Sequence, residues 1–501
     1  MIKTDFLVIG SGIAGLNFAL EAAKYGEVLV ITKKEIAESN TNYAQGGIAA
    51  VLDKADSTQA HINDTMVAGS FHNDKEAVRI MVEEGPDLVR NLSKIVPFQK
   101  NKDKEILLTK EGGHSSRRIA FCGDTTGYEI EKALVKAVRH EKKITVLEHT
   151  FVTDLIVKDK TVIGASFLDY YTNSVNQVFV KAVILASGGA SQIYYPHTTN
   201  PEISTGDGIA MGLLAGCKSK DLEFFQFHPT ALFKKGLPTF LLSESLRGEG
   251  ALLKNYKDEV FMAHYDERKE LAPRDIVARS IVSEEKKGPV YLDLRHFSLD
   301  TFQKHFKNIY ETLTDYGMDP KNELIPVSPA AHYTVGGLRV DHFGFTGLDG
   351  LYAFGEVACT GVHGANRLGS NSLLEALVFS HRVSQKLPEL KKRKIIVENP
   401  KNLVAVSYSL PEVNRIKDTL RINMWKYAGV IRTGEGLKKC QVILIDLEKK
   451  LQKIYCINKD YFETRNMLIV SKEVVKAALK RKVSLGAHFI ENLTTSHDQP
   501  Q

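Results

Sequence analysis

The sequence has few cysteines, no long apolar run and no strong excess of charge. Its five cysteines are scattered without a CxxC pair or a cluster with histidine, at Cys122, Cys217, Cys359, Cys440 and Cys456. This spacing argues against disulfides, a structural zinc site and an iron–sulfur cluster, so no metal site is expected. Thiols of this kind are typical of a reducing compartment, which favours a cytoplasmic location.

Hydropathy and charge exclude two further classes of protein. No run approaches the roughly 18 apolar residues that a membrane-spanning helix needs. The N-terminus leads directly into a strand pattern, without the apolar segment of a signal peptide. The net charge of +6 is spread over 66 basic and 60 acidic side chains. Since a nucleic-acid footprint needs a basic stripe, we expect neither nucleic acid nor membrane as a partner, whereas a small anionic substrate fits.

The first thirty residues carry a strand–glycine–helix–strand pattern. An apolar β run at residues 6–9 is followed by Gly10-Ser11-Gly12-Ile13-Ala14-Gly15, a helical stretch, and a second β run at residues 28–31. In G-x-G-x-x-G the first glycine makes the tight turn and the second lets backbone N–H groups approach a pyrophosphate. The third allows close helix–strand packing, and the helix N-terminus attracts phosphate. The pattern predicts a dinucleotide site.

The residues after the second β run depart from the NAD-binding pattern. That pattern expects an acidic residue for the ribose, but the chain reads Thr32-Lys33-Lys34-Glu35. Glu35 lies late for this role, and Lys33 is a candidate for contact with phosphate or with the adenine side. The motif therefore indicates a dinucleotide without indicating NAD.

Two later segments repeat the strand-then-glycine pattern, at residues 182–189 and 351–356. A nucleotide-binding domain that begins at residue 1 and is completed after residue 340 must contain an insertion. Beyond residue 411 apolar residues recur at helical spacing, which predicts a helical bundle. The residues of this apolar face are Leu437, Cys440, Leu444, Leu447, Leu451, Met467, Val470, Val474 and Ala478.

Several blocks in a fixed order resemble the succinate dehydrogenase, fumarate reductase and L-aspartate oxidase flavoproteins. Residues 40–50 are similar to the family's second FAD loop, residues 204–208 and 355–356 to its ribityl and isoalloxazine contacts, and residues 371–377 to the helix that faces the flavin. The blocks extend over residues 5–385, nearly the whole chain. The resemblance implies FAD bound at Gly10, Ser11, Gly12, Ile13, Ala14, Gly15, Lys33, Asn40, Thr41, Asn42, Tyr43, Ala44, Gln45, Gly46, Gly47, Val152, Asp207, Glu356, Ser372 and Leu373.

The pattern and the resemblance together predict an α/β fold with three parts. A Rossmann-like FAD-binding domain is expected from residues 1–221 and 334–400, which are discontinuous in the chain. An inserted α+β capping domain is expected at residues 222–333 and carries substrate-binding groups. A C-terminal helical bundle is expected at residues 401–501.

The resemblance also implies a C4 dicarboxylate substrate held over the flavin by histidines and arginines. Two carboxylates need charge-assisted donors, and a guanidinium binds a carboxylate through two parallel hydrogen bonds. Ser243 stands where the family more often has threonine, so a hydroxyl donor is kept. Taken singly, a residue such as His228 is more often a satisfied core histidine than a ligand. The implied substrate-binding positions are Glu111, His228, Ser243, His332 and Arg367.

Arg274 matches the family's proposed proton-transfer residue and is the expected catalytic residue. Arginine is a poor proton acceptor in water, so this role needs a relay, for which Glu244 and Arg247 are candidates. Alternatively Arg274 mostly positions and polarises the substrate. Taken alone, Arg274 is equally explained as an ion-pair partner of Asp275 or Glu270.

Two departures separate the branches of the family. The respiratory members attach FAD covalently through a histidine that corresponds here to Asn40, so the resemblance implies non-covalent FAD. Residues 109–118 resemble the aspartate oxidase loop, in which a glutamate binds the substrate's ammonium group. Glu111 is that glutamate, and it would favour an amino acid over succinate. The plainer interpretation of Glu111 is a solvated loop carboxylate.

The activity implied by the resemblance is FAD-dependent oxidation of L-aspartate to iminoaspartate, with O₂ or fumarate as electron acceptor. This is the first step of de novo NAD biosynthesis, and the unstable product suggests hand-off to quinolinate synthase. The alternative is a soluble fumarate reductase or a succinate dehydrogenase-type flavoprotein subunit. Near the C-terminus the family tends to carry Glu-Ser-Arg-Gly-Ala-His, whereas this chain has Val483-Ser484-Leu485-Gly486-Ala487-His488. The missing Glu and Arg leave open how the helical domain contacts the core.

Overall fold

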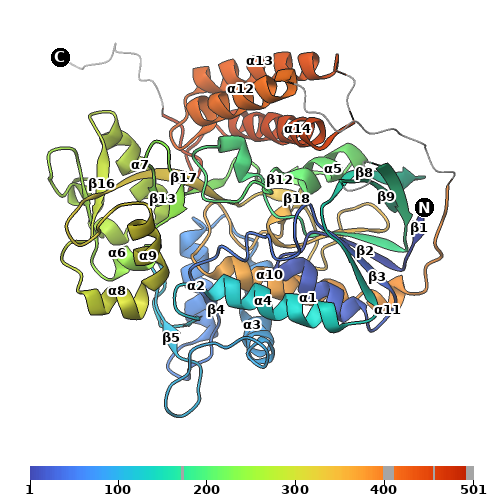
Figure 1. Ribbon diagram of the computed structural model, residues 1–501, viewed down its shortest axis with the longest axis horizontal. Coiled ribbons are helices and arrows are strands. Elements are labelled where there is room, and N and C mark those ends of the chain that lie inside the picture. Colours follow the sequence, from blue (N-terminus) through green and yellow to red (C-terminus); the bar gives the residue numbers. More distant parts are fainter. Residues whose placement is uncertain (171–173, 399–410, 455–456, 492–501) are drawn as a thin grey trace.

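The computed structural model describes residues 1–170, 174–398, 411–454 and 457–491. Its largest α/β layer is built on a parallel sheet of strand order β19-β11-β2-β3-β7 (Figure 1). The strands are β2 (Phe6–Ile9), β3 (Val28–Ile31), β7 (Ile144–Leu147), β11 (Ala182–Leu185) and β19 (Leu351–Ala353). The short apolar runs predicted at residues 6–9 and 28–31 are central strands of this sheet, as continuous apolar runs favour.

Both faces of the parallel sheet are covered. Phe6 and Val8 of β2 pack under the helices α1 (Ile13–Ala22), α3 (Lys75–Leu92), α4 (Thr126–His140) and α10 (Asn371–Ser384). Leu7 and Ile9 face the opposite side. There a sheet of order β1-β10-β9-β8 and the helix α5 (Asp207–Ala215) pack. Its strands are β1 (Ile2–Lys3), β10 (Ser174–Phe179), β9 (Thr161–Asp169) and β8 (Thr150–Lys158).

A second body of the molecule is an antiparallel sheet with its own apolar core, drawn in yellow-green in Figure 1. The strands, in order, are β14 (Phe240–Leu241), β13 (Phe225–Leu232), β17 (Ile325–Thr334), β16 (Val290–Asp293) and β15 (Leu252–Lys254). Four helices accompany it: α6 (Glu244–Gly248), α7 (Arg274–Glu285), α8 (Leu299–His305) and α9 (Lys307–Asp315). This α+β body is inserted in the chain between β11 and β19.

Three long helices, α12 (Pro411–Ala428), α13 (Gly434–Leu451) and α14 (Lys459–Lys480), pack together above the sheets in Figure 1. All nine apolar residues predicted for their inner face are buried. The α/β fold with an inserted α+β part and a C-terminal helical bundle is therefore confirmed. The residue limits given for the three domains stay a prediction.

Short elements complete the fold. The remaining strands are β4 (Ile48–Ala49), β5 (Leu108–Thr109), β6 (Ile119–Ala120), β12 (Ser219–Lys220), β18 (Gly337–Arg339) and β20 (Ala358–Cys359). The remaining helices are α2 (Thr58–Ala68) and α11 (Leu387–Leu390), with 3₁₀ turns η1 (Ser191–Tyr194), η2 (Met262–His264), η3 (Lys269–Leu271) and η4 (Gly355–Val357).

Within the described ranges, no helix is long and apolar enough to cross a membrane. The four cysteines that these ranges contain carry free thiols, and Cys456 lies outside them.

The altered stretch near the C-terminus contacts the core through other residues. Arg432 Nη1 donates to His488 Nδ1 at 2.8 Å and to the Glu223 carbonyl at 2.7 Å. His488 Nε2 lies 2.9 Å from the Arg481 carbonyl, and Arg481 Nε lies 2.6 Å from the Glu223 carboxylate. Polar contacts between the helical bundle and the core are thus made without the family's Glu and Arg.

Candidate active site

A cavity of about 1230 Å³ extends from the edge of the parallel sheet to the antiparallel sheet. Small-molecule sites typically enclose roughly 300–1,000 Å³, so this cavity has room for more than one ligand. Its glycine-rich end is formed by the turn between β2 and α1, the loop 40–47 and the N-terminus of α10. Its opposite end, the charged cluster, consists of Glu111, His228, Glu244, Arg274, His332 and Arg367.

Nearly all of the positions expected from sequence line this one cavity. Of the twenty positions expected for FAD, eighteen contribute to its wall, and Gly15 and Asn42 do not. A Cβ on Gly15 would lie 2.1 Å from the Gly10 carbonyl oxygen, so Gly15 serves helix–strand packing. The backbone N–H of Asn42 bonds back to Ser39 instead. The six positions expected for the substrate, Glu111, His228, Ser243, Arg274, His332 and Arg367, all line the cavity.

The turn between β2 and α1 presents the N-terminus of a helix to the cavity. Gly10 has φ +111°, and a Cβ there would lie 2.3 Å from the Ala186 carbonyl oxygen of the neighbouring strand end. The N-cap residue of α1, Gly12, offers no side-chain cap, and no acidic residue lies in the first turn. Thr41 Oγ1 accepts from the Ile13 N–H at 3.0 Å. The N-terminal N–H groups of a helix carry partial positive charge, so this turn suits a phosphate.

Lys33 is held by protein carboxylates. Its Nζ lies 2.7 Å from Thr205 Oγ1, 2.8 Å from Asp207 Oδ2 and 2.9 Å from Glu463 Oε1 of α14. Burial acts to lower the pKa of Lys33, but Asp207 and Glu463 outweigh it and raise the pKa. Lys33 is therefore a cation that ties the cavity wall to the helical bundle, a contact that its sequence position did not indicate.

Asn40 uses both ends of its amide within the protein. Its Nδ2 donates to Glu356 Oε2 at 2.9 Å, and its Oδ1 accepts from Ser204 Oγ at 2.7 Å. The second oxygen of Glu356 accepts from the Thr334 N–H at 2.8 Å. Burial raises the pKa of Glu356. The side chain at the position of the family's flavin-bonding histidine is thus a hydrogen-bonded amide.

The residues present fit FAD. Two helix N-termini whose N-cap residues make no side-chain hydrogen bond to the helix, those of α1 and α10, open into the cavity. Two buried polar atoms of the cavity lining, Gln45 Oε1 and Ser187 Oγ, have no hydrogen-bond partner among the described residues. Buried polar atoms are almost always paired, so these two indicate a polar ligand. A long ligand with a diphosphate and a flat ring matches this combination of backbone donors and glycine surfaces.

In the charged cluster, one carboxylate and one amide oxygen hold two arginines. Arg274, at the start of α7, places both Nε and Nη2 at 2.7 Å from Glu244 Oε2. Its Nη1 lies 3.0 Å from Gln226 Oε1, which also accepts from Arg367 Nε at 3.2 Å. Arg367 in turn lies over the ring of Tyr333, 4.4 Å from its centroid. The two guanidiniums are therefore fixed side by side.

The plainer explanation of Arg274 as a partner of Asp275 does not match these contacts. Asp275 pairs with Arg279 one helical turn away, at 2.9 Å. Glu244, named from the sequence as a relay candidate, contacts Arg274 directly, and its other oxygen lies 3.4 Å from Arg247 Nη2. Burial acts to raise the pKa of Glu244, but Arg274 and Arg247 outweigh it and hold the pKa below its usual range. Glu244 is thus an anion between two buried cations.

The two histidines are neutral hydrogen-bonding groups. His228 on β13 and His332 on β17 have ring centroids 5.4 Å apart. The Thr230 N–H donates to His228 Nδ1 at 3.3 Å, which leaves the ring proton of His228 on Nε2. Thr199 Oγ1 lies 2.8 Å from His332 Nδ1. Burial lowers the pKa of both histidines well below its usual range, and the nearby arginines act in the same direction.

Glu111 is a buried side chain of the cavity, with 7 % of its surface exposed, so it is not a solvated loop carboxylate. Its Oε2 accepts a hydrogen bond from Ser370 Oγ at 2.8 Å. Burial raises the pKa of Glu111, while Arg274 opposes the shift. Ser243 starts α6, where its Oγ accepts from the Ser245 N–H at 3.3 Å. The charged cluster thus presents Arg274 and Arg367 in the same cavity as the carboxylate of Glu111.

Sequence reasoning missed two residues that organise this cluster. Gln226 joins Arg274 to Arg367, and Ser370 holds Glu111. A signal existed for Gln226, since it lies two residues before His228 in one strand and the period of two places both on one face. For Ser370 the chain offers no comparable signal, because its partner is 259 residues away.

Comparisons with known proteins identify the family of the chain. A family model described as FAD binding domain matches residues 5–373, and one described as Fumarate reductase flavoprotein C-term matches residues 417–500. The chain is 42 % identical to the chloroplastic L-aspartate oxidase of Oryza sativa over 97 % of its own length and 81 % of the relative's. It is 42 % identical to the L-aspartate oxidase of Vibrio cholerae, over 97 % and 95 % of the two chains.

Solved structures agree as well. A variant of FrdA from the quinol fumarate reductase of E. coli has a TM-score of 0.91 at 29 % identity and covers 98 % of this chain and 92 % of that one. Sdh1 of Mycobacterium smegmatis gives 0.84 at 31 % identity, covering 98 % and 89 %. The chain is therefore an FAD-dependent oxidoreductase of the succinate dehydrogenase and fumarate reductase flavoprotein class. Within that class it belongs to the L-aspartate oxidase family, which confirms the family and the cofactor expected from the sequence.

Proposed function

We propose that the protein oxidises L-aspartate to iminoaspartate, with O₂ or fumarate as the final electron acceptor, and so supplies the first step of de novo NAD biosynthesis. The observation that carries the proposal is the position of Glu111 in one cavity with Arg274 and Arg367. Two guanidiniums match two carboxylates, and one carboxylate matches an ammonium group. The membership of the L-aspartate oxidase family supports the same reading.

In this proposal each residue of the charged cluster binds one part of the substrate. Arg274 and Arg367 hold the two carboxylates, and His228 and His332 donate hydrogen bonds to them. Glu111 forms an ion pair with the ammonium group, which succinate lacks. FAD, when bound, supplies the acceptor for the two electrons that leave the substrate. Burial of the cluster excludes water and strengthens each of these contacts.

Arg274 acts mainly by positioning the substrate, because its guanidinium stays protonated while Nε donates to Glu244 and Nη1 donates to Gln226. Glu244 is the nearest group able to exchange a proton with Arg274, and its second oxygen faces Arg247. We infer that any proton passing through Arg274 moves along this row of three side chains. Ser243 donates or accepts a hydrogen bond at the cavity wall beside them.

Anaerobic mixing of the purified protein with L-aspartate or with succinate tests the proposal. Bleaching of the flavin absorbance by L-aspartate, and slower bleaching by succinate, is the expected result. Rapid bleaching by succinate with none by L-aspartate would instead establish the alternative, a fumarate reductase or succinate dehydrogenase-type flavoprotein. Repeating the L-aspartate reaction with O₂ or fumarate as the only acceptor identifies which one restores the flavin colour faster.

Non-covalent attachment of FAD is a further part of the proposal, supported by the amide of Asn40 and its two hydrogen bonds. Acid precipitation separates the alternatives, because released flavin stays in the supernatant. A yellow pellet would contradict the role given to Asn40.

The proposal places the protein in the cytoplasm, where quinolinate synthase would receive its unstable product. Plant relatives are named as chloroplastic, and that location is a property of those proteins. Cell fractionation tests the location. A coupled assay in which added quinolinate synthase raises the yield from L-aspartate above that of sequential incubation tests the hand-off.

A further inference from the structure

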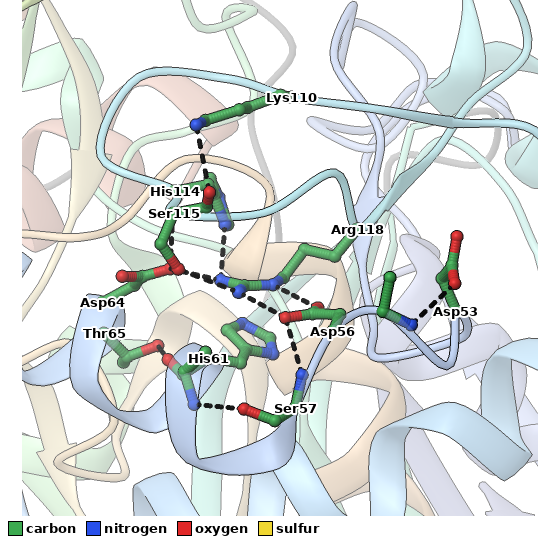
Figure 2. A network of polar contacts seen from close by, with 12 residues as sticks. Asp53, Asp56, Ser57, His61, Asp64, Thr65, Lys110, His114, Ser115 and Arg118 are labelled. Carbon is green, nitrogen blue, oxygen red and sulfur yellow. Dashed lines mark hydrogen bonds and ion pairs between the residues drawn. The ribbon is translucent and has the colours of Figure 1, made fainter.

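A network of polar side chains, centred on Arg118 with His114, Asp56 and Asp64, lies outside the lining of the cavity (Figure 2). At its centre the fully buried Arg118, just before β6, places Nε and Nη2 at 2.8 and 2.9 Å from the two carboxylate oxygens of Asp56. Its Nη1 bonds to Asp64 of α2. The guanidinium is therefore fixed by two carboxylates, and its orientation does not depend on the substrate.

Arg118 also fixes the proton of His114. Arg118 Nη1 lies 3.2 Å from His114 Nδ1, and since a guanidinium can only donate, Nδ1 is the acceptor. The ring proton is then on Nε2, which lies 3.0 Å from the carbonyl oxygen of Gly369 and donates to it. Burial lowers the pKa of His114 to about 4, so the ring stays neutral at neutral pH.

The bond from His114 ends beside the carboxylate of Glu111. Gly369 precedes Ser370, whose Oγ donates to Glu111 Oε2 at 2.8 Å. The backbone N–H of His114 closes a turn on the Glu111 carbonyl at 3.3 Å. A Cβ on Gly369 would lie 2.8 Å from Glu111 Oε2, so the carboxylate and the entry to α10 are in close contact. His114 thus joins the loop that carries Glu111 to the segment that holds its side chain.

We propose that His114, held by Arg118 as the Nε2–H tautomer, positions the carboxylate of Glu111 and so sets the preference for an amino acid over an unsubstituted dicarboxylate. His114 is a positioning residue, since it does not line the cavity. The inference rests on the proposed function, because it concerns the ammonium group of the substrate. Gly369 also lies close to Arg274, whose Nη2 would be 3.3 Å from a Cβ there. None of Arg274, Arg367, His228 and His332 hydrogen-bonds to the network, however, so binding of a dicarboxylate depends on it less than binding of an amino acid does.

Steady-state kinetics of His114→Leu, with FAD content measured, tests the proposal. Loss of the hydrogen bond from His114 to the Gly369 carbonyl is expected to raise the KM for L-aspartate about tenfold, which corresponds to about 1.4 kcal/mol. The KM for fumarate in dye-driven reduction and both kcat values should change less than about twofold. His114→Gln, which can still donate to the Gly369 carbonyl, restores the KM for L-aspartate to within about threefold. Lys110→Met is the matched control, because it removes a bond from the exposed Lys110 to Ser115 in the same loop.

A double-mutant cycle separates positioning from general structural damage. If His114 acts through Glu111, His114→Leu has little further effect on the KM for L-aspartate in a Glu111→Gln background. An equal rise in both backgrounds overturns the proposal, as does a parallel loss of aspartate oxidation, fumarate reduction and FAD content, or a KM for L-aspartate that does not change. The unmodified protein is a separate arm: failure to oxidise L-aspartate there would show that the proposed function itself is wrong.

Discussion

The glycine-rich end of the cavity and its charged cluster differ in what forms their walls. At the glycine-rich end, backbone N–H groups and glycine Cα positions form much of the wall, and residues 10–15 lie within one turn and one helix. In the charged cluster, side chains from β13, α6, α7, β17 and two loops converge, and Gln226 and Glu244 fix the positions of the arginines. The turn at residues 10–15 depends mainly on local conformation, although loop 40–47 and α10 complete that end of the cavity, whereas the charged cluster depends on long-range packing throughout.

This difference determines how each end responds to substitution. The glycine-rich end is disturbed by added side-chain atoms, because backbone atoms already occupy the space. A buried charge cluster is disturbed by removed atoms, because an uncompensated charge remains behind. Substitutions at the glycine-rich end are therefore expected to strain the backbone and release the cofactor. Substitutions in the charged cluster are expected to reduce substrate binding and turnover while the cofactor stays bound.

The largest effect is expected for Arg274→Leu. The substitution removes a cation that faces the substrate and leaves Glu244 without one of its two partners. Loss of a buried, hydrogen-bonded charge contact to a ligand costs about 2–5 kcal/mol, so kcat/KM for L-aspartate falls roughly 30- to 5,000-fold. Stopped-flow reduction of the flavin by L-aspartate measures the loss. Because Arg274 lies outside the glycine-rich end, FAD content should stay near that of the unmodified protein, and its loss would contradict the separation of the two ends.

Gly10→Ala tests the opposite end. At φ +111° a side chain is strained, and its Cβ would meet the Ala186 carbonyl oxygen at 2.3 Å. A residue in such a conformation costs about 1–3 kcal/mol, and we expect a lower melting temperature and weaker FAD binding. Gly216→Ala is the matched control, since Gly216 has φ +102° but no atom within 4 Å of the added Cβ. Equal losses in the two variants would show that backbone strain alone, without the close contact, explains the effect.

The same difference explains how much the sequence could predict. The strands at residues 6–9 and 28–31 and the glycine turn between them follow from local pattern, as does the apolar face of α13 and α14. The set of substrate-binding residues came from motif resemblance, and the structure brings all of them to one cavity. Which atoms hold them could not be predicted, because hydrogen bonds such as Ser370 to Glu111 join segments 259 residues apart.

Lys33 illustrates a second limit of local pattern. Its place after β3 suggested contact with phosphate or adenine, but its charge is directed to Asp207 and to Glu463 of α14. Glu463 lies 430 residues further along the chain, so only the packing of the helical bundle on the core reveals this contact. Sequence position alone states that a cation is present, and tertiary structure decides which anion it binds.

Glu111→Gln and a pH profile examine the charged cluster more finely. Since burial raises the pKa of Glu111, the carboxylate becomes protonated as pH falls through that raised value, and its ion pair with the substrate ammonium is lost. The KM for L-aspartate therefore rises on acidification, whereas the KM for fumarate does not follow it. Glu111→Gln should show a KM for L-aspartate about tenfold higher that no longer depends on pH in this range. An unchanged acid limb in the variant would assign the titration to another group.

The smallest effect is expected at the contact between the helical bundle and the core, where neither end of the cavity is involved. Arg481 Nε lies 2.6 Å from Glu223 Oε1, and the Arg481 side chain is 27 % exposed. Glu223 is only 5 % exposed, but the Gln of Arg481→Gln keeps a hydrogen-bond donor for its carboxylate. Arg481→Gln should therefore lower Tm by about 2–4 °C and leave both KM values unchanged. Lys482→Gln removes an exposed charge at the next position and is the control. A large fall in Tm, or released FAD, would show that Arg481 replaces the family's missing Glu and Arg as the main link between the helical bundle and the core. In that case the stability of the cavity would depend on this third region as well as on its two ends.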